Sequence, residues 1–584
     1  MVREQFTVAA VYCCVAAAVC VSSAVILATK KRHRRNQGSR HGDRHQGKNG
    51  RPFGREMSSR GDHSYYVTSR VAPQTEEGFV LFHDGDGEQL SPPMKLSGDV
   101  QRLMRSFDVD PVRGFLPHVD PLRRFLQEEL QPWEAMADAL PSLLAVGQAR
   151  RPLETLSPLP IDILTCHRER MRALLLLCVF AHASVWGNPD IPQDTIPKGI
   201  AVPLHALALA EGLPPVLTHT SLILHNWHRL DPLGPVRTNN LACNCHFLGG
   251  LDETWFYIAT VEIEARGGGV FGALLQAQHA IAEAEFTPIP GLSSCPAQAT
   301  AAAYESAARV VFEALGVAQA GIRSMRESLS RMPVGCHPLI FYQRVRPFLS
   351  GWKSNPTLPD GVLYEGVSSD RQKFYGGSAA QSTLFPALDA ALEVSHSMHS
   401  SNAFLLEMRN YMPPGHRRLL EHLVDPACPS IRRFVQNFPN EAPLASAQNE
   451  RNCTHTKAEE MVNGKSVDGE GCRLAGDSNG TVKTVVNGNP NSPIHGADKL
   501  REAYNGCLSA LSDFRSTHLG IVGSYILQQQ KRGVKAGDPN SREDFAGGKG
   551  TGGTPLLDFL KPLKEDARAA FLEEHGATSV AHET

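Results

Sequence analysis

The sequence predicts an all-helical protein, and two observations carry this prediction. From about Ser106 onward, apolar residues recur at steps of three and four, as between Phe125 and Leu144, and this spacing is typical of amphipathic helices. Strand-like alternation of apolar and polar residues is rare along the chain. The composition, with 42% hydrophobic and 20% charged residues, is that of an ordinary globular protein, and the net charge of -2 gives no case for binding nucleic acid.

The first 29 residues are predicted to be a transmembrane anchor. The run from Phe6 to Thr29 has 24 residues and no charged side chain, and it is long enough to cross a bilayer. A basic cluster follows at residues 30–35 and, by the positive-inside rule, would keep the rest of the chain in the cytoplasm. Two alternatives stay open, a signal peptide cleaved near Ser23 or an organelle-targeting leader, and either would leave a processed soluble protein.

Residues 30–104 are predicted to be a basic, mostly disordered tether. Residues 30–60 alone contain eleven Lys or Arg against two acidic residues, and they have few side chains that could build a core. Next to an anchor, such a segment favours attraction to anionic lipid over binding of nucleic acid.

A second interruption of the helical pattern lies at residues 428–497. Residues 449–498 contain no Phe, Trp or Tyr and are dense in Asn, Gly, Ser and Asp, so they cannot bury enough apolar surface to order themselves. The helical pattern resumes at Leu500. We therefore expect a disordered insertion within one domain and not a boundary between two.

One predicted helix, residues 501–530, carries two polar residues on its apolar face. The stripe that starts at Tyr504 and Leu508 continues, at the same steps of four and three, through Arg515 and His518. A buried arginine needs a carboxylate partner, because an unpaired charge is costly in a protein interior. A buried histidine is satisfied by one hydrogen bond or by a metal ion, and the spacing alone does not choose between a core histidine and a haem ligand.

Nine short segments, in the same order along the chain, resemble the indoleamine 2,3-dioxygenase family. The likeness runs from about Arg113 to Lys561 and is interrupted by the insertion. The matching segments are residues 196–203 (IPKGIAVP), 213–215 (LPP), 225–227 (HNW), 348–356 (FLSGWKSNP), 364–366 (YEG), 374–382 (FYGGSAAQS), 411–417 (YMPPGHR), 511–519 (LSDFRSTHL) and 550–554 (GTGGT).

The resemblance implies a monomer in which a small helical domain, residues 105–210, packs over a large haem-binding helical domain, residues 211–584. It implies haem b as the cofactor and L-tryptophan and O2 as substrates. Both oxygen atoms would be inserted across the C2–C3 bond of the indole of tryptophan or a related indoleamine, giving N-formylkynurenine, the first step of the kynurenine pathway. An unidentified electron donor would keep the iron ferrous.

The resemblance also assigns the residues on the side of the haem at which the protein would bind the iron. His518 matches the proximal iron ligand of the family, and a neutral imidazole is the expected donor for a ferrous haem that binds O2 on its other side. Arg515 matches an arginine that pairs with a carboxylate, and Asp389 stands at the partner's position in the motif. This pair would supply the counter-charge that the apolar stripe requires, without touching the substrate.

On the substrate side, Arg346 would bind the carboxylate of the amino acid through both arms of its guanidinium group, while Phe341 would pack against the indole. Phe256 and Thr260 match a phenylalanine and a hydroxyl residue of the family that lie one helical turn apart, which implies that both face the haem. The loop over the haem edge would be formed by Gly377, Ser378 and Ala379. None of these substrate-side positions is a carboxylate, which agrees with a reaction that needs exclusion of water more than a general base.

The sequence departs from the family at two positions of the predicted pocket wall. His219 stands where a tyrosine is common, and Leu222 belongs to the same wall. A histidine there could alter substrate choice or oxygen chemistry, could bind the iron as a sixth ligand, or could be an inert wall residue. The alternative function is a haem-binding or signalling member of the family with little or no turnover. A helical scaffold without cofactor is disfavoured by the intact site residues.

Overall fold

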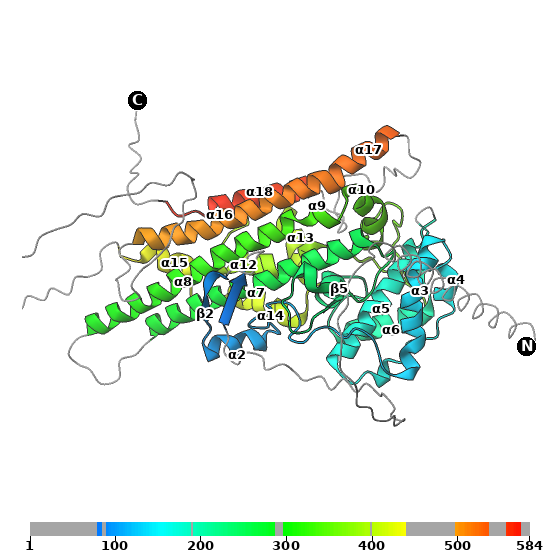
Figure 1. Cartoon of the computed structure of the whole chain (residues 1–584), viewed down its shortest axis with the longest axis horizontal. Helices are drawn as coiled ribbons and strands as arrows, with labels where there is room; N and C mark the ends of the chain where they lie inside the picture. The colour runs from blue at the N-terminus through cyan, green and yellow to red at the C-terminus, as the bar shows by residue number, and fades with distance from the viewer. Residues whose placement is uncertain are drawn as a thin grey trace, which may run out of the picture. The chain divides into compact units, whose positions relative to one another are not determined.

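The computed structural model describes residues 79–83, 89–188, 191–286, 296–396, 400–439, 497–536 and 556–573. All of them belong to one unit of the chain, Ala72–Thr584. The described part is mainly helical, as the spacing of apolar residues predicts. Its long helices α7 (Leu251–Phe286), α8 (Pro296–Ser330) and α16 (Ala497–Val522) run side by side (Figure 1).

The shorter helices complete the scaffold around these three. Before α7 they are α2 (Gly98–Ser106), α3 (Gln131–Ala145), α4 (Arg150–Glu154), α5 (His167–Trp186) and α6 (Lys198–Ala210). After α8 they are α9 (Met332–Gly335), α10 (Pro338–Ile340), α11 (Arg346–Leu349), α12 (Leu384–Ala391), α13 (Ser400–Arg409), α14 (Pro414–Leu423), α15 (Ile431–Asn437), α17 (Gln528–Ala536) and α18 (Leu556–Ala569).

Several short turns of other helix types interrupt or join these helices. The 3-10 turns are η1 (Glu128–Leu130), η2 (Ile161–Ile163), η4 (Thr238–Asn240) and η6 (Ala379–Gln381). The π-helical turns are η3 (Thr220–Leu224), η5 (Phe341–Val345) and η7 (Gly523–Leu527).

The strands of the described part are short and form two-stranded sheets only. β1 (Phe79–His83) pairs antiparallel with β2 (Gln89–Lys95), and β4 (Trp227–Arg229) with β5 (Leu241–Cys243). β3 (Thr195–Ile196) pairs in parallel with β6 (Leu363–Tyr364). β1, β2 and the start of α2 lie within the residues predicted as a tether, where Leu96, Val100 and Met104 are buried in the core.

The prediction of a transmembrane anchor must be corrected. Within the ranges that the structure describes, no helix is both long enough and apolar enough to cross a membrane. The long helices carry ionisable side chains, such as Glu262, Glu264 and Arg266 on α7, and these are costly in lipid. Residues 1–29, on which the prediction rested, lie outside the described residues, as do most of the predicted tether and residues 440–496 of the predicted insertion. The anchor, and the membrane attachment inferred from it, are therefore not retained.

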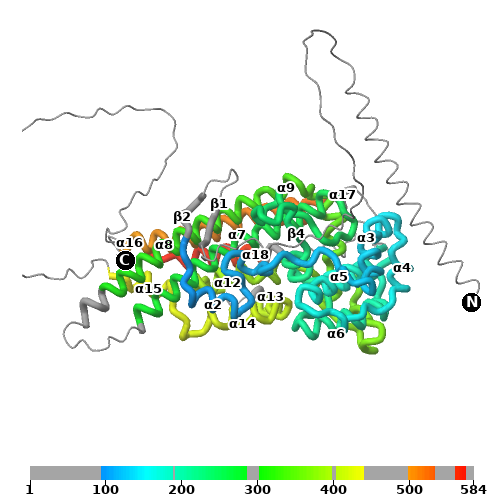
Figure 2. Tube along the Cα trace, turned by 60° about the horizontal axis from the view of Figure 1, so that its bottom comes forward, coloured from blue at the N-terminus to red at the C-terminus, as the bar shows by residue number. Residues whose placement is uncertain are grey.

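Two hydrophobic cores meet along α7. The beginning of α7 contributes Tyr257 and Val261 to a first core, which it shares with α3, α5 and α6. The rest of the helix contributes Val270 and Phe271 to a second core, shared with α8, α12 and α16. The helices α3 to α6 pack on one another (Figure 2). The first core takes residues from both sides of position 210 and so does not mark a boundary there. The predicted division into two domains at this position stays a prediction.

The segment after α2 crosses α7 at a point where two backbones touch. A Cβ atom on Gly268 of α7 would lie 2.4 Å from the backbone nitrogen of Gly114, and Gly114 itself has a φ of +63°. Both conditions require glycine, because a side chain would collide at the first position and strain the backbone at the second. This crossing holds the N-terminal segment against the middle of α7.

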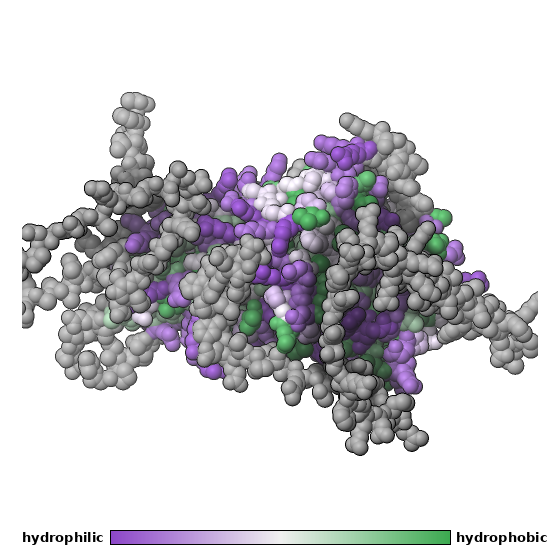
Figure 3. All heavy atoms as spheres, viewed as in Figure 1, coloured by the Kyte–Doolittle hydropathy of each residue, from purple (hydrophilic) through white to green (hydrophobic). Residues whose placement is uncertain are grey.

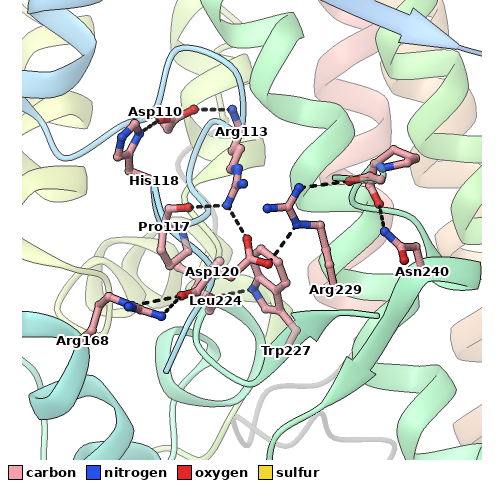
Figure 4. A network of polar contacts seen from close by, with 12 residues as sticks. Asp110, Arg113, Pro117, His118, Asp120, Arg168, Leu224, Trp227, Arg229 and Asn240 are labelled. Atoms are coloured by element: carbon pink, nitrogen blue, oxygen red, sulfur yellow. Dashed lines mark hydrogen bonds and ion pairs between the residues drawn. The ribbon is translucent and has the colours of Figure 1, made fainter. Parts of the chain in front are cut away.

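A polar network joins the same segment to α5 and β4 (Figure 4). The carboxylate of Asp120 accepts hydrogen bonds from Nη1 of Arg113 at 2.8 Å and from Nε of Arg229 at 2.9 Å, while Arg168 of α5 donates to its carbonyl oxygen at 2.8 Å. Burial alone would raise the pKa of Asp120, but the bonds and charges of Arg229 and Arg113 lower it on balance. The carboxylate stays ionised and cross-links three parts of the fold.

A buried ion pair connects α3 with α5. Glu134 and Arg172 are almost inaccessible, and their side chains make two hydrogen bonds of 2.6 Å and 3.0 Å to each other.

Polar and charged side chains are prominent on the face shown in Figure 3, where apolar residues appear only as small separate patches. The two cores position the cavity described next.

Candidate functional site

A cavity of about 450 Å³ lies where the two cores meet. Its wall takes Leu222 and Phe341 from the first core and Ile263 and Phe514 from the second. The structure brings all of the predicted site residues to this one cavity. Those that line it are Phe256, Thr260, Phe341, Arg346, Gly377, Ser378, Ala379, Asp389, Arg515 and His518.

Three π-helical turns contribute to the wall. Leu222 comes from η3, Phe341 from η5 and Tyr525 from η7, and Arg346 follows η5 directly. A π-helical turn inserts an extra residue into a helical segment, and such turns occur frequently at functional sites. The cavity is therefore framed by places where the regular helix repeat is interrupted.

α16 presents His518 to the cavity. Among the described residues, none forms a hydrogen bond with its imidazole, and the side chain is partly exposed to the cavity that it lines. Burial lowers the pKa of His518 to about 4, so the ring is neutral at physiological pH. A neutral imidazole whose nitrogens are not engaged by protein groups is well suited to bind an iron ion.

The ion pair predicted from the apolar stripe of α16 is present. Nη2 of Arg515 donates to both carboxylate oxygens of Asp389, at 2.5 Å and 2.6 Å, and Nη1 donates to the carbonyl oxygen of Leu563 on α18 at 2.7 Å. Burial alone would raise the pKa of Asp389, but the charge of Arg515 and a hydrogen bond from His396 lower it on balance. The ionised pair fixes α16 against α12 one helical turn from His518.

His396 extends this pair in a way that the sequence did not predict. Its Nε2 lies 3.0 Å from Oδ2 of Asp389 and its Nδ1 lies 3.1 Å from Oδ2 of Asp566 on α18. Burial alone would lower the pKa of His396, but its hydrogen bonds to the carboxylates of Asp389 and Asp566, together with the charge of Asp389, raise it on balance. In its protonated form His396 bridges the two carboxylates and so joins α12 to α18.

The aromatic part of the wall is formed by α7 and η5. The rings of Phe256 and Phe341 are tilted against each other, with centroids 4.7 Å apart. The hydroxyl group of Thr260 donates to the carbonyl oxygen of Phe256 at 2.8 Å. Arg346 is only 4% exposed, and its guanidinium carbon lies 5.5 Å from the ring centroid of Tyr342. A buried guanidinium group that lines a cavity offers a binding site for a carboxylate.

The loop at residues 376–379 is held by Gln381. The side chain of Gln381 donates to the carbonyl oxygen of Gly376 at 2.8 Å and accepts from the backbone nitrogen of His219 at 3.0 Å. Ser378 caps η6 by accepting from the backbone nitrogen of Ala380 at 3.3 Å. The loop, η6 and His219 are therefore tied together at the cavity. The matching segment at 550–554 lies outside the described residues.

Glu264 is a cavity residue that the sequence analysis missed. It lines the wall, and continuing the four-residue steps from Phe256 and Thr260 along α7 leads to it. That spacing was a usable signal. Glu264 thus adds a carboxylate to a wall on which none of the substrate-side positions matched to the family is one. The bonds that Glu264 makes with His219 and Ser382 are considered below.

Comparison with known proteins decides the family. The family model of indoleamine 2,3-dioxygenase matches residues 103–455 and 477–570. The chain belongs to the indoleamine 2,3-dioxygenase family. It is 30% identical over 481 residues to indoleamine 2,3-dioxygenase 1 of Rattus norvegicus, a match that covers 81% of this chain and 96% of the rat protein.

Two fungal members of the indoleamine 2,3-dioxygenase family show a similar likeness. The indoleamine 2,3-dioxygenase of Saccharomyces cerevisiae is 30% identical, over 80% of this chain and 93% of the yeast protein. The 6-hydroxytryptophan 2,3-dioxygenase of Fusarium equiseti is 28% identical, over 80% of this chain and 98% of the fungal protein. The present indoleamine 2,3-dioxygenase family member is accordingly an oxidoreductase that acts on tryptophan or related indoles.

The cavity fits the haem on which the indoleamine 2,3-dioxygenase family depends. It combines an imidazole that is neutral and makes no bond to a described residue, an apolar lining and a loop of small residues. At Gly376 of this loop, an added Cβ atom would lie 2.0 Å from the carbonyl oxygen of Leu349, so only glycine allows the chain to pass there. The donor set, one neutral imidazole, is that of a haem iron ligand.

Replacing Asp389 by Ala should lower the free energy of unfolding by about 3 kcal/mol or more, because Arg515 stays charged in the interior without its carboxylate. Asp513→Ala is the control, since Asp513 pairs with Arg326 at the surface and should contribute less than about 1 kcal/mol. Urea unfolding of both variants measures the difference. An unchanged unfolding midpoint for the Asp389 variant would contradict a stabilising role for the pair.

Stability should also depend on the charge of His396. Because its folded pKa is raised above the ordinary 6.5, its contribution is fully present below about pH 6.5 and is lost as the pH rises through the folded pKa. His396→Gln removes this titration. We therefore expect the gap in unfolding free energy between the native protein and the variant to narrow as the pH is raised from about 6.5 into the alkaline range. A gap that is constant across this range would show that His396 does not titrate in this way.

Proposed function

We propose that the protein inserts both atoms of O2 across the indole C2–C3 bond of L-tryptophan, or of a closely related indoleamine, to give N-formylkynurenine. One observation carries the proposal: the same cavity is lined by the neutral imidazole of His518 and by the buried guanidinium group of Arg346. An iron-binding group and a carboxylate-binding group in one apolar cavity are what an amino-acid dioxygenase with a haem requires.

The residues of the chain would divide the work as follows. His518 would hold the haem, and the haem iron would supply the activation of O2 once reduced by a separate electron donor. Arg346 would bind the substrate carboxylate with its planar fork of N–H donors, which fixes both position and direction. Phe341 and Phe256, whose rings lie in contact, would pack against the indole.

Exclusion of water is the other contribution of the chain. The wall is built largely from apolar residues of both cores, and the loop at residues 376–379 is fixed to η6 by Gln381. An apolar surrounding strengthens the interaction between Arg346 and a carboxylate, because competing water is absent. The protein would thus add two things to the chemistry of the cofactor: orientation of the substrate and exclusion of water.

His518→Ala should abolish retention of haem, because the imidazole that would hold the iron is then missing from the cavity. Thr517→Ala is the matched control on the same helix, since the Thr517 hydroxyl donates to the carbonyl oxygen of Asp513 and does not line the cavity. The measurement is the Soret absorbance per mole of purified full-length protein. Full haem content in the His518 variant would show that the proximal assignment is wrong.

Arg346→Ala should leave haem bound but lower kcat/KM for tryptophan by about 100-fold or more, because a charge-assisted, two-pronged contact to the carboxylate is lost. Arg344→Ala, two residues away and exposed, should change it little. The assay follows N-formylkynurenine after tryptophan is added to the reduced protein in air. A Soret band without product in the native protein would reject the proposed activity and favour a haem-binding member with little turnover.

A further inference from the structure

A buried polar cluster of His219, Glu264 and Ser382 lies on the cavity wall and has no part in the function proposed above. His219 is 4% exposed and Glu264 is 3% exposed. Nε2 of His219 lies 2.9 Å from Oε1 of Glu264, and Oγ of Ser382 lies 2.6 Å from the same oxygen. All three residues line the cavity.

The hydrogen bonds fix how the imidazole is oriented. Oγ of Ser382 accepts a hydrogen bond from the backbone nitrogen of Leu384 at 3.2 Å, so its own hydrogen points to Oε1 of Glu264. Oε1 therefore acts as an acceptor, and His219 donates to it from Nε2. The backbone nitrogen of His219 is held in addition by Gln381. His219 is therefore held by hydrogen bonds at two places, its backbone nitrogen and Nε2 of its ring.

These hydrogen bonds leave Nδ1 as the polar atom that the imidazole can offer to a ligand. No described residue forms a hydrogen bond with Nδ1 of His219, although the side chain lines the cavity. Nδ1 carries a lone pair in the neutral ring and an N–H group in the protonated ring. A hydroxyl group pairs with either form, because it can both donate and accept.

Unsubstituted tryptophan offers no such group on its six-membered ring, whose outer carbons carry only hydrogen. If Arg346 binds the carboxylate, the indole is confined between that anchor and the remaining wall of the cavity, which includes His219 and Glu264. Because no described residue pairs with Nδ1 of His219, a ligand that supplies a hydrogen-bonding group at this part of the wall gains affinity.

We propose that His219, positioned by Glu264, is a specificity-determining residue that favours indole substrates carrying a hydroxyl group on the six-membered ring. The inference rests on the proposed function, since it assumes that the indole of an amino acid occupies this cavity. Glu264 acts through His219 and is a positioning residue.

The test compares pairs of ligands that differ in this one group. Full-length, haem-loaded protein is titrated with each ring isomer of hydroxytryptophan and with the fluorotryptophan substituted at the same position, and Kd is read from the change in the haem spectrum. The two ligands are similar in size, but fluorine cannot donate a hydrogen bond. We expect the native protein to prefer the hydroxyl compound for at least one isomer by about 5- to 10-fold, the worth of one hydrogen bond.

Three variants separate the role of His219 from a general structural role. His219→Phe should remove the preference, and Glu264→Gln should reduce it, because the ring then loses its fixed hydrogen-bond direction. Thr220→Val is the matched control: Thr220 is the next residue, and its hydroxyl is buried without a hydrogen-bond partner among the described residues. This variant should keep the preference of the native protein. The ratio of the two Kd values within one variant cancels any general loss of affinity.

The outcomes distinguish this inference from the proposed function. Equal preferences in the native protein and the His219→Phe variant at every isomer, with tryptophan still converted, would overturn the inference alone. Failure of the native protein to bind any of the tryptophans would overturn both. A low-spin ferric spectrum that becomes high-spin in His219→Phe would place Nδ1 on the iron and also reject the inference. If His219→Phe does not fold, an unchanged preference in Glu264→Gln rejects it.

Discussion

The position of the His518 imidazole in the cavity depends on one buried ion pair. Arg515 and Asp389 bind each other through two short hydrogen bonds, and Arg515 also donates to the backbone of α18. His518 lies on α16 one helical turn from Arg515, so the angle at which its ring enters the cavity follows from this pair. Removing two charges from water is costly, and the cost is offset only because each bond is well formed. Loss of either partner would leave a charge unpaired in the interior, so the fold holds the site through a contact that tolerates little change.

The two hydrophobic cores supply the other half of the arrangement. Neither core contains the site: the cavity forms where they meet, and each contributes part of its wall. π-helical turns at η3, η5 and η7 line this junction. The aromatic pair of Phe256 and Phe341 belongs to the apolar wall of this cavity, which Arg346 also lines.

Much of the site could be predicted from the sequence, because its residues sit in short ordered segments and at helical spacing. The stripe of α16 alone indicated that Arg515 and His518 face inward. His396 and Asp566 gave no such signal, since they are 170 positions apart and meet only through packing of α18 on the core. The π-helical turns leave no periodic trace in so few residues. The anchor was inferred from the length and hydropathy of a single run, which lies outside the described residues, and no helix within them is long and apolar enough to cross a membrane.

α7 belongs to both cores, and this has a consequence for cooperativity. A helix of 36 residues that is buried at one end by one set of neighbours and at the other end by another couples the two sets mechanically. Loosening either core would destabilise α7, the helix that carries Phe256, Thr260 and Glu264. Ligand capture and global stability are then governed by a common element, so that binding in the cavity strengthens regions of the protein that no ligand atom reaches.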